Sequence, residues 1–129
     1  ITRYASTNAD VPIIRNEELI LLRAEAALAL GDRAAAITDL NYVRVNAGGL
    51  APLPAGYTGD LVSEILYNRR YSLFFEYGHR WIDMRRYGRL NQLEKLLPTH
   101  RVFPLVPLPQ QECLARGNAP RGCVTVDGI

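Results

Sequence analysis

The stretch from Leu61 to Gly88 constrains the fold most, because it combines the apolar spacing of a helix with many charged side chains. Phe74 and Phe75 lie beside the apolar positions, so a helix here would be apolar around much of its circumference and largely buried. The stretch therefore predicts the long central helix of an all-helical core. Its apolar positions recur in steps of three, four or seven residues: Val62, Leu66, Leu73, Tyr77, Trp81 and Met84.

Charged groups on a buried helix must be paired, and the spacing of this stretch allows it. Glu76 and Arg80 are four residues apart, while Asp83 can reach Arg80 or Arg86 at three residues. Glu76 and Asp83 would be a catalytic pair only if their carboxyl groups were free to exchange protons. Carboxylates neutralised by arginine are poor general acids. We therefore predict structural ion pairs, no catalytic residue and no enzymatic activity.

Length and composition predict one ordinary globular domain over residues 1–129. A net charge of +2 does not indicate nucleic acid, and the arginines between residues 80 and 89 are interleaved with acidic residues. A polyanion-binding face is therefore the weaker interpretation. No apolar run reaches the roughly 18 residues of a membrane span. The chain has no visible signal peptide and does not begin with methionine, so we expect a processed or truncated chain.

Two cysteines and two histidines are the remaining chemically reactive candidates. Cys113 and Cys123 enclose a Gly- and Pro-containing loop and are predicted to form a disulfide if the protein is exported. Two thiols without further ligands do not make a closed zinc site, and His79 and His100 each lack a partner four residues away. No metal and no cofactor are expected.

The first half of the chain predicts a helical hairpin. Helices are expected at about 16–30 and 33–47, capped by Asn16 and Asp32 and ended by Gly31 and by Gly48-Gly49. The short connection forces antiparallel packing, and a run of small residues lets the axes approach closely, as in tetratricopeptide-like units. The alanines expected at this contact are Ala24, Ala26, Ala27, Ala29, Ala34, Ala35 and Ala36.

The rest of the chain is predicted to alternate between loops and short helices. A Pro-rich loop at 50–57 should precede the third helix, which Thr58 or Asp60 would cap and Gly78 would bend. Gly88 should lead into a short helical segment at 90–97. The prolines between Phe103 and Pro109 exclude a central strand or a helix and suggest a strap over the helices. One or two helical turns are expected at 110–115.

Four ordered blocks of this sequence resemble the C-terminal portion of SusD/RagB-family outer-membrane lipoproteins. They cover nearly the whole chain and are Val11–Leu28 with Leu30–Asp32, Ala36–Gly48, Phe75–Arg86 and Phe103–Glu112. The sequence departs from the family pattern at Asn68, where a glutamate is usual, and at Ser72-Leu73, where Glu-Leu is usual. Both changes remove expected ion-pair partners of Arg69 and Arg70.

The resemblance implies an all-α fold of antiparallel, tetratricopeptide-like helix pairs with a long irregular C-terminal segment. It also implies surface binding of an oligosaccharide or other nutrient, in partnership with a SusC-like TonB-dependent transporter at the outer membrane. Family members are several times longer and carry a lipidated N-terminal cysteine. We therefore expect a C-terminal piece, mainly scaffold, that meets the membrane only through a lipid anchor outside this chain and that can self-associate. The alternative is a free-standing tetratricopeptide-like protein-interaction module.

The aromatic residues give no firm ligand-binding prediction. Trp81 could stack on a sugar, but on so apolar a helix it is more often a core residue. Tyr4 and Tyr57 lie in looser segments and are better stacking candidates. Because the resembled family contacts glycans largely through other regions, no residue is assigned to ligand binding.

Overall fold

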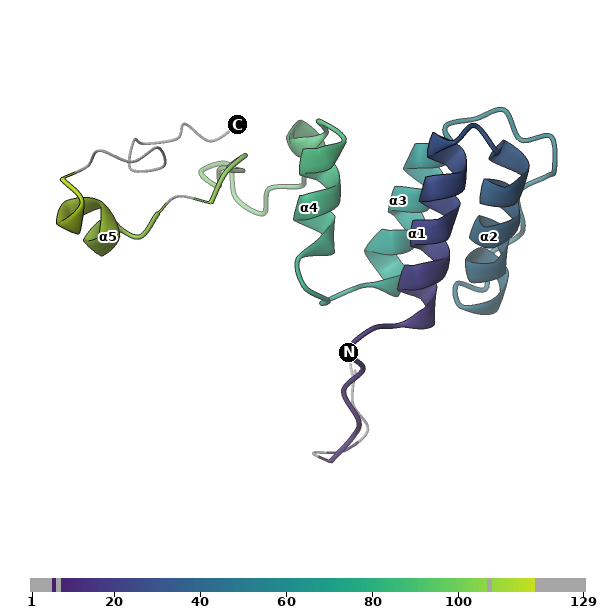
Figure 1. The fold of residues 1–129 in the computed structure, drawn as a ribbon, viewed down its shortest axis with the longest axis horizontal. Coiled ribbons are helices and arrows are strands. Elements are labelled where there is room, and N and C mark those ends of the chain that lie inside the picture. Colours follow the sequence, from purple (N-terminus) through teal and green to yellow (C-terminus); the bar gives the residue numbers. More distant parts are fainter. Residues whose placement is uncertain (1–5, 7, 107, 118–129) are drawn as a thin grey trace. The chain divides into compact units, whose positions relative to one another are not determined.

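The structure is a computed structural model that describes residues 6, 8–106 and 108–117. Within those residues every regular element is a helix, as the sequence predicted (Figure 1). The chain divides into two compact units between His79 and Arg80. The helices are Asn16–Ala29 (α1), Arg33–Asn46 (α2), Leu61–Ser72 (α3), His79–Arg86 (α4) and Gln110–Ala115 (α5), with a 3-10 turn (η1) at Leu90–Gln92.

Helix α1 and helix α2 form the predicted antiparallel hairpin. The Asp32 carboxylate accepts a hydrogen bond from the backbone N–H of Ala35 at 2.9 Å and so caps α2. Gly31 adopts φ 86°, a left-handed conformation that glycine reaches without steric cost. Asn16 was wrongly predicted as a cap: it is the first helical residue, and Arg15 holds the cap position without a side-chain bond.

Helix α3 packs against both members of the hairpin. Both α2 and α3 run antiparallel to α1, so α1 begins at the end of this unit where the other two finish (Figure 1). The linker between α2 and α3 is fixed by side chains of α2. The Asn41 amide bonds both backbone groups of Leu53, at 2.8 and 2.9 Å, and Arg33 donates to the carbonyls of Tyr57 and Gly59 at 3.1 Å.

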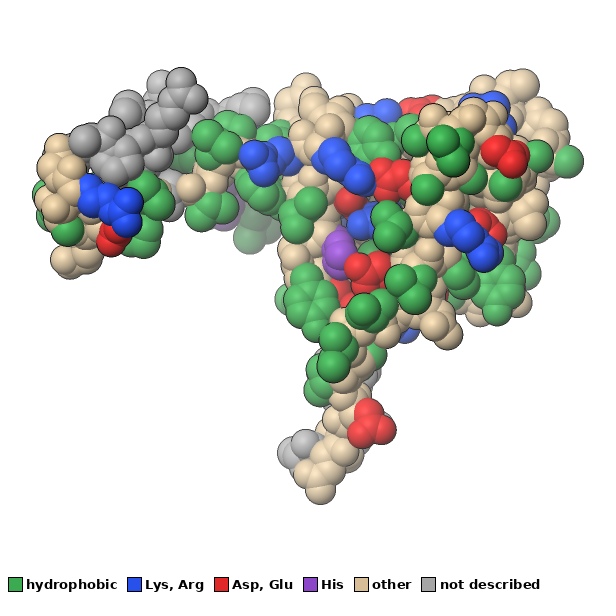
Figure 2. All heavy atoms as spheres, in the orientation of Figure 1, with side chains coloured by type: hydrophobic (Ala, Val, Ile, Leu, Met, Phe, Trp, Pro, Cys, Tyr) green, Lys and Arg blue, Asp and Glu red, His purple; other side chains and the backbone are tan. Residues whose placement is uncertain are grey.

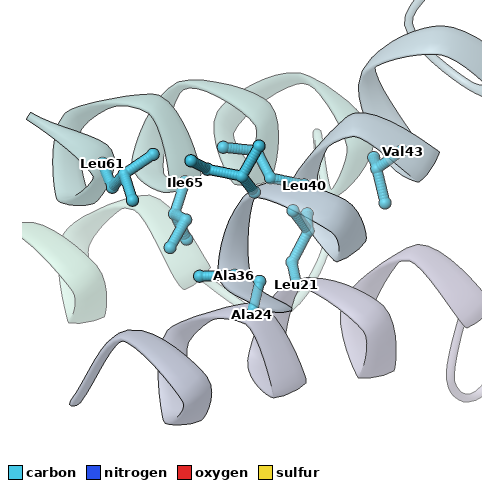
Figure 3. Packing of buried hydrophobic residues seen from close by; sticks show 8 residues of the cluster. Leu21, Ala24, Ala36, Leu40, Val43, Leu61 and Ile65 are labelled. Carbon is cyan, nitrogen blue, oxygen red and sulfur yellow. The ribbon is translucent and has the colours of Figure 1, made fainter. Parts of the chain in front are cut away.

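The three helices enclose one apolar cluster, part of which is drawn in Figure 3. Leu21, Leu40 and Ile65 bring one large side chain from each helix, and each is at most 1% exposed. Burial of such side chains is the main favourable contribution to folding. The cluster consists of Leu21, Ala24, Ala36, Ile37, Leu40, Val43, Leu61 and Ile65.

The alanine contact between α1 and α2 is narrower than predicted. Ala24 and Ala36 are fully buried, and Ala27 packs against the cluster. Ala26, Ala29 and Ala34 are exposed, as is Ala47 at the end of α2. The fully buried part of the alanine contact therefore consists of Ala24 and Ala36, with Ala27 partly buried, rather than of an extended alanine face.

The predicted long helix from Leu61 to about Gly88, with a bend at Gly78, is wrong. Helix α3 ends at Ser72, and the chain turns before α4 begins at His79. Phe75, Tyr77 and Gly78 have φ of 62°, 38° and 71°, which a right-handed helix excludes. The turn also reverses the burial expected for its aromatic residues. Phe75 is 81% exposed and Tyr77 66% exposed, whereas Glu76 is buried.

The second unit contains the remaining predicted elements. Gly88 adopts φ 65° and ends α4, as expected. The predicted helical segment at 90–97 is reduced to η1, and α5 occupies the helical turns expected at 110–115. Trp81 is half-buried rather than a full core residue, and its indole N–H donates to the carbonyl of Phe103 at 2.9 Å. That bond connects α4 to the proline-containing segment.

Two predictions, the disulfide and the stacking role of Tyr4, involve residues outside the described part of the chain. Cys113 on α5 is buried, but Cys123 lies outside the described residues, so the disulfide between them stays a prediction. Tyr4 is outside them as well. Among residues 6, 8–106 and 108–117, none of the helices has the length and apolar character needed to cross a membrane.

Candidate functional site

A cluster of buried charged groups lies where α1 begins and the turn after α3 ends. Glu76 is 4% exposed, and its Oε1 lies 3.6 Å from Nη1 of Arg15. Nε2 of His79 lies 3.4 Å from Oε1 of Glu18, and Nδ1 of the same ring lies 3.4 Å from Nη2 of Arg69. We call these five residues the buried charge cluster. Its acidic and basic groups neutralise one another within the first unit.

The residues predicted as structural ion pairs fall in both units. Asp83 is 2% exposed, and its Oδ1 lies 4.0 Å from Nη2 of Arg86. Glu76 belongs to the first unit and Arg80 to the second, so their pairing stays a prediction. The carboxylates of Glu76 and Asp83 are both buried, each beside an arginine, Arg15 and Arg86 respectively. This arrangement favours a structural role for both.

The arginines of α4 contact aromatic rings. The guanidinium carbon of Arg85 lies 5.4 Å from the ring centre of Trp81, and that of Arg86 lies 5.1 Å from the ring centre of Tyr87. Both distances are within cation–π range. On the face shown in Figure 2, acidic, basic and hydrophobic side chains are interspersed. The expectation that the protein binds no nucleic acid stays a prediction.

Sequence reasoning missed the ion pairs between the three helices. Arg23 on α1 donates two hydrogen bonds to the carboxylate of Asp39 on α2, at 2.6 and 2.7 Å. These hydrogen bonds and the negative charge of Asp39 raise the pKa of the Arg23 guanidinium. Arg44 on α2 bonds Glu64 on α3 at 2.7 Å. These partners are 16 and 20 residues apart, so no local spacing rule could reveal them. The Arg23–Asp39 pair is bidentate and the Arg44–Glu64 bond is short, so both pairs help to align the helices, with a smaller contribution from Arg23, whose side chain is 72% exposed.

Tyr57, one of the two predicted stacking candidates, is instead part of the helix packing. It is half-buried against the apolar cluster, and its hydroxyl lies 3.3 Å from Oε1 of Glu64. Burial, followed by the charge of Glu64, raises the pKa of the phenol above its usual 10.0. Tyr57 is therefore a poor platform for a ligand.

Two hollows meet at the end of the first unit where α1 begins. The first has a volume of about 680 Å³ and lies between the lead-in to α1 and the last turns of α2, beside Tyr42. The second, about 470 Å³, lies between the loop after α2 and the last turns of α3, beside Tyr67 and Tyr71. Each volume is within the roughly 300–1,000 Å³ typical of small-molecule sites. Arg15, Glu17 and Ala47 line both hollows, which together we call the tyrosine groove.

The tyrosine groove exposes three aromatic rings. Tyr42 is 58% exposed, Tyr67 46% and Tyr71 59%. The rings of Tyr67 and Tyr71 have centres 4.9 Å apart and are tilted by 58°. The helical spacing of four residues between them was a usable signal. The spacing alone does not identify a ligand surface, because it also describes a buried helix face.

Comparison with known protein families decides the family of this chain. The model of the SusD family matches residues 1–118. The chain belongs to the SusD family. No curated protein and no solved structure matches it.

Membership confirms the resemblance drawn from the four sequence blocks and agrees with the all-helical fold. SusD-family proteins are binding proteins of the outer-membrane surface that bind glycans and work with SusC-like transporters. Family membership therefore suggests glycan or other nutrient binding for this chain.

The departures from the family pattern have local structural consequences. Asn68 is buried, and its amide donates to the carbonyl of Glu64 at 2.8 Å, one turn back on α3. Arg69 lies beside His79, and the guanidinium carbon of Arg70 lies 5.8 Å from the ring centre of Tyr71.

In the described part of the chain, no group of three or more histidine, cysteine or acidic residues is placed to hold a metal ion.

Proposed function

We propose that this chain is the C-terminal helical part of an outer-membrane surface protein that binds glycans and delivers them to a SusC-like TonB-dependent transporter. The family match over residues 1–118 carries this proposal. A lipid anchor outside the chain would attach the protein to the membrane. The bound nutrient would be an oligosaccharide, and transport itself would belong to the partner.

Within that protein, the three-helix unit would serve mainly as a scaffold. The apolar cluster of α1, α2 and α3 and the long-range pairs Arg23–Asp39 and Arg44–Glu64 support this role, because they fix three helices relative to one another. The buried charge cluster supports it as well. Its carboxylates are occupied by basic groups rather than presented to a substrate, which favours binding over catalysis.

A binding screen of the full chain tests the proposed function. The protein would be applied to an array of neutral and acidic glycans and, in parallel, to an array of peptides. Binding to glycans with no peptide signal is expected. Peptide binding without glycan binding would contradict the proposal and favour a tetratricopeptide-like interaction module, whose helical hairpin α1–α2 is present here.

A second measurement addresses the partner and the exclusion of catalysis. The full chain and a SusC-like transporter would be co-expressed, and co-purification from outer-membrane extracts is expected. In the same preparations no glycan hydrolysis is expected. Hydrolysis that Glu76→Gln abolishes, with the variant still folded by circular dichroism, would contradict the non-enzymatic proposal.

A further inference from the structure

We propose that the tyrosine groove is a binding site for a neutral oligosaccharide. The residues that line the groove lie where α1 begins. Figure 1 shows that α2 and α3 finish at this same end of the first unit. The choice of a saccharide rests partly on the proposed function, whereas the location rests on the structure alone. The proposal goes further than a scaffold role, because it places ligand contacts on the three-helix unit itself.

The exposed rings provide the apolar part of such a site. A pyranose ring presents C–H groups on its faces, and these pack favourably against the negative face of an aromatic ring. Tyr67 and Tyr71 offer two neighbouring rings at one side of the groove, and Tyr42 offers a third at the other. Rings on both sides of the shared residues suit a ligand of several linked sugar units rather than a single one.

Carboxamide side chains provide the polar part of the site. Asn16 and Asn46 line the first hollow, and Asn68 lines the second. A carboxamide both donates and accepts hydrogen bonds, as sugar hydroxyl groups do. Two of these amides are held in place: Asn46 donates to the carbonyl of Tyr42, and Asn68 to that of Glu64, each at 2.8 Å.

The charges around the groove favour a neutral ligand. Arg15, where the two hollows meet, lies 3.6 Å from Glu17 and 3.6 Å from Glu76. Its positive charge is therefore offset by two carboxylates, which weakens attraction for an anionic ligand. Arg15 likewise offsets the negative charge of Glu17, and Asp10 adds one further carboxylate to the first hollow, so the lining disfavours an anion. A polyhydroxylated, uncharged molecule matches the rings and amides.

The groove is also rigid where its backbone lines it. The loop after α2 is closed by hydrogen bonds from Gly48 N–H to the Val43 carbonyl, at 3.0 Å, and from Leu50 N–H to the Arg44 carbonyl, at 2.8 Å. Gly49 between them has φ 61°, which favours glycine. A preformed wall lowers the entropy that a ligand must overcome on binding.

Isothermal titration calorimetry of the full chain tests the proposal. The probes are neutral linear tetrasaccharides of glucose, mannose, xylose and galactose, with a tetrasaccharide of glucuronic acid as the charged comparison. The variants are Tyr67→Ala, Tyr71→Ala and the conservative Tyr71→Phe, with Tyr77→Ala as the matched control. Tyr77 is the same residue type and is exposed, but does not line the groove.

We expect at least one neutral probe to bind, with Tyr67→Ala and Tyr71→Ala each raising Kd about tenfold. Tyr71→Phe, which keeps the ring, and Tyr77→Ala should bind as the unmodified chain does. Backbone amide shifts on adding the probe should concentrate at residues 46–50 and 67–72, a readout that needs no variant.

Each other outcome contradicts a stated part of the account. Neutral binding that neither alanine variant weakens, or amide shifts confined to other residues, would overturn the groove as the site and leave the proposed function intact. Binding of the glucuronic acid probe alone would overturn the neutral ligand. An unmodified chain that binds none of the probes would overturn the groove as a site for a neutral oligosaccharide, while the array of neutral and acidic glycans tests the proposed function separately.

Discussion

The buried charge cluster and the tyrosine groove are neighbours in the first unit, but they use opposite kinds of side chain. In the cluster, Glu76 and Arg69 are charged and almost fully buried. In the groove, Tyr67 and Tyr71 are aromatic and about half exposed. Charged side chains are normally exposed to water, whereas aromatic side chains are normally buried. Each region therefore reverses the common preference, and each reversal needs a reason.

The reasons differ, and the difference separates structure from function. Buried charges are tolerated when they are neutralised nearby, and the cluster achieves this with acidic and basic groups from α1, α3 and the following turn. The exposed rings make ring–ring and arginine contacts within the fold, between Tyr67 and Tyr71 and between Arg70 and Tyr71, and these leave much of their surface open to water. Grouped beside hollows, they are typical of ligand-binding surfaces. Only Arg15 belongs to both regions.

The largest expected effect is on stability and comes from the cluster. Glu76→Gln keeps the size of the side chain but leaves basic groups without their buried counter-charge. Loss of one partner of a fully buried pair costs about 3–5 kcal/mol, and since the Arg15 side chain is 40% exposed we expect about 2 kcal/mol. The free energy of unfolding from urea titration measures it.

The control is the same substitution in an exposed pair. Glu112→Gln removes the partner of Arg116 on α5, where both side chains are largely exposed, and should cost less than about 0.5 kcal/mol. Equal losses for the two variants would mean that burial of Glu76 is not what makes its charge matter.

Arg15 should show an intermediate effect on both regions. Arg15→Ala removes a charged contact of Glu76 and part of the wall between the two hollows. We expect a loss of about 1 kcal/mol in unfolding free energy, and a severalfold rise in Kd for the neutral tetrasaccharide, smaller than with the tyrosine variants. Urea titration and calorimetry of one preparation provide both values. An unchanged Kd would mean that Arg15 contributes to the buried charge cluster but not to ligand binding in the tyrosine groove.

The smallest expected effect is on the pH dependence of stability and comes from Tyr57, which packs against the apolar cluster. The pKa of the Tyr57 phenol is raised in the folded chain. As pH rises, the phenol therefore loses its proton in the unfolded state at a lower pH than in the folded state. Its contribution to stability is complete below pH about 10 and is lost as pH rises through the folded pKa. Tyr57→Phe should therefore make the melting temperature fall less steeply above pH 10. An identical slope in both proteins would argue against burial of this phenol.

The hairpin, its connection and the cap of α2 could be predicted because the signals are local. Asp32, Gly31 and the paired glycines after α2 each act within a few residues. The break after α3 could not be predicted in this way. Leu73 and Tyr77 continue the helical spacing, and only the left-handed conformations of Phe75 and Tyr77 show that the helix has ended. Gly78 was the visible signal, and it was interpreted as a bend rather than an end.

The candidate site was harder to predict than the fold. The groove joins residues 9–17, 42–50 and 67–72, which are brought together only by packing of the three helices. Within one segment, the four-residue spacing of Tyr67 and Tyr71 was detectable. Its meaning depended on exposure, because the same spacing also describes a buried helix face.

The most direct test of the central claim measures stability and binding on the same two variants. In one preparation each, Glu76→Gln and Tyr71→Ala would be examined by urea titration and by calorimetry with the neutral tetrasaccharide that binds best. Glu76→Gln should lower the free energy of unfolding and, at a temperature where the variant is folded, leave Kd unchanged. Tyr71→Ala should leave the free energy of unfolding unchanged and raise Kd. A Glu76→Gln variant of unaltered stability that no longer binds would contradict the account.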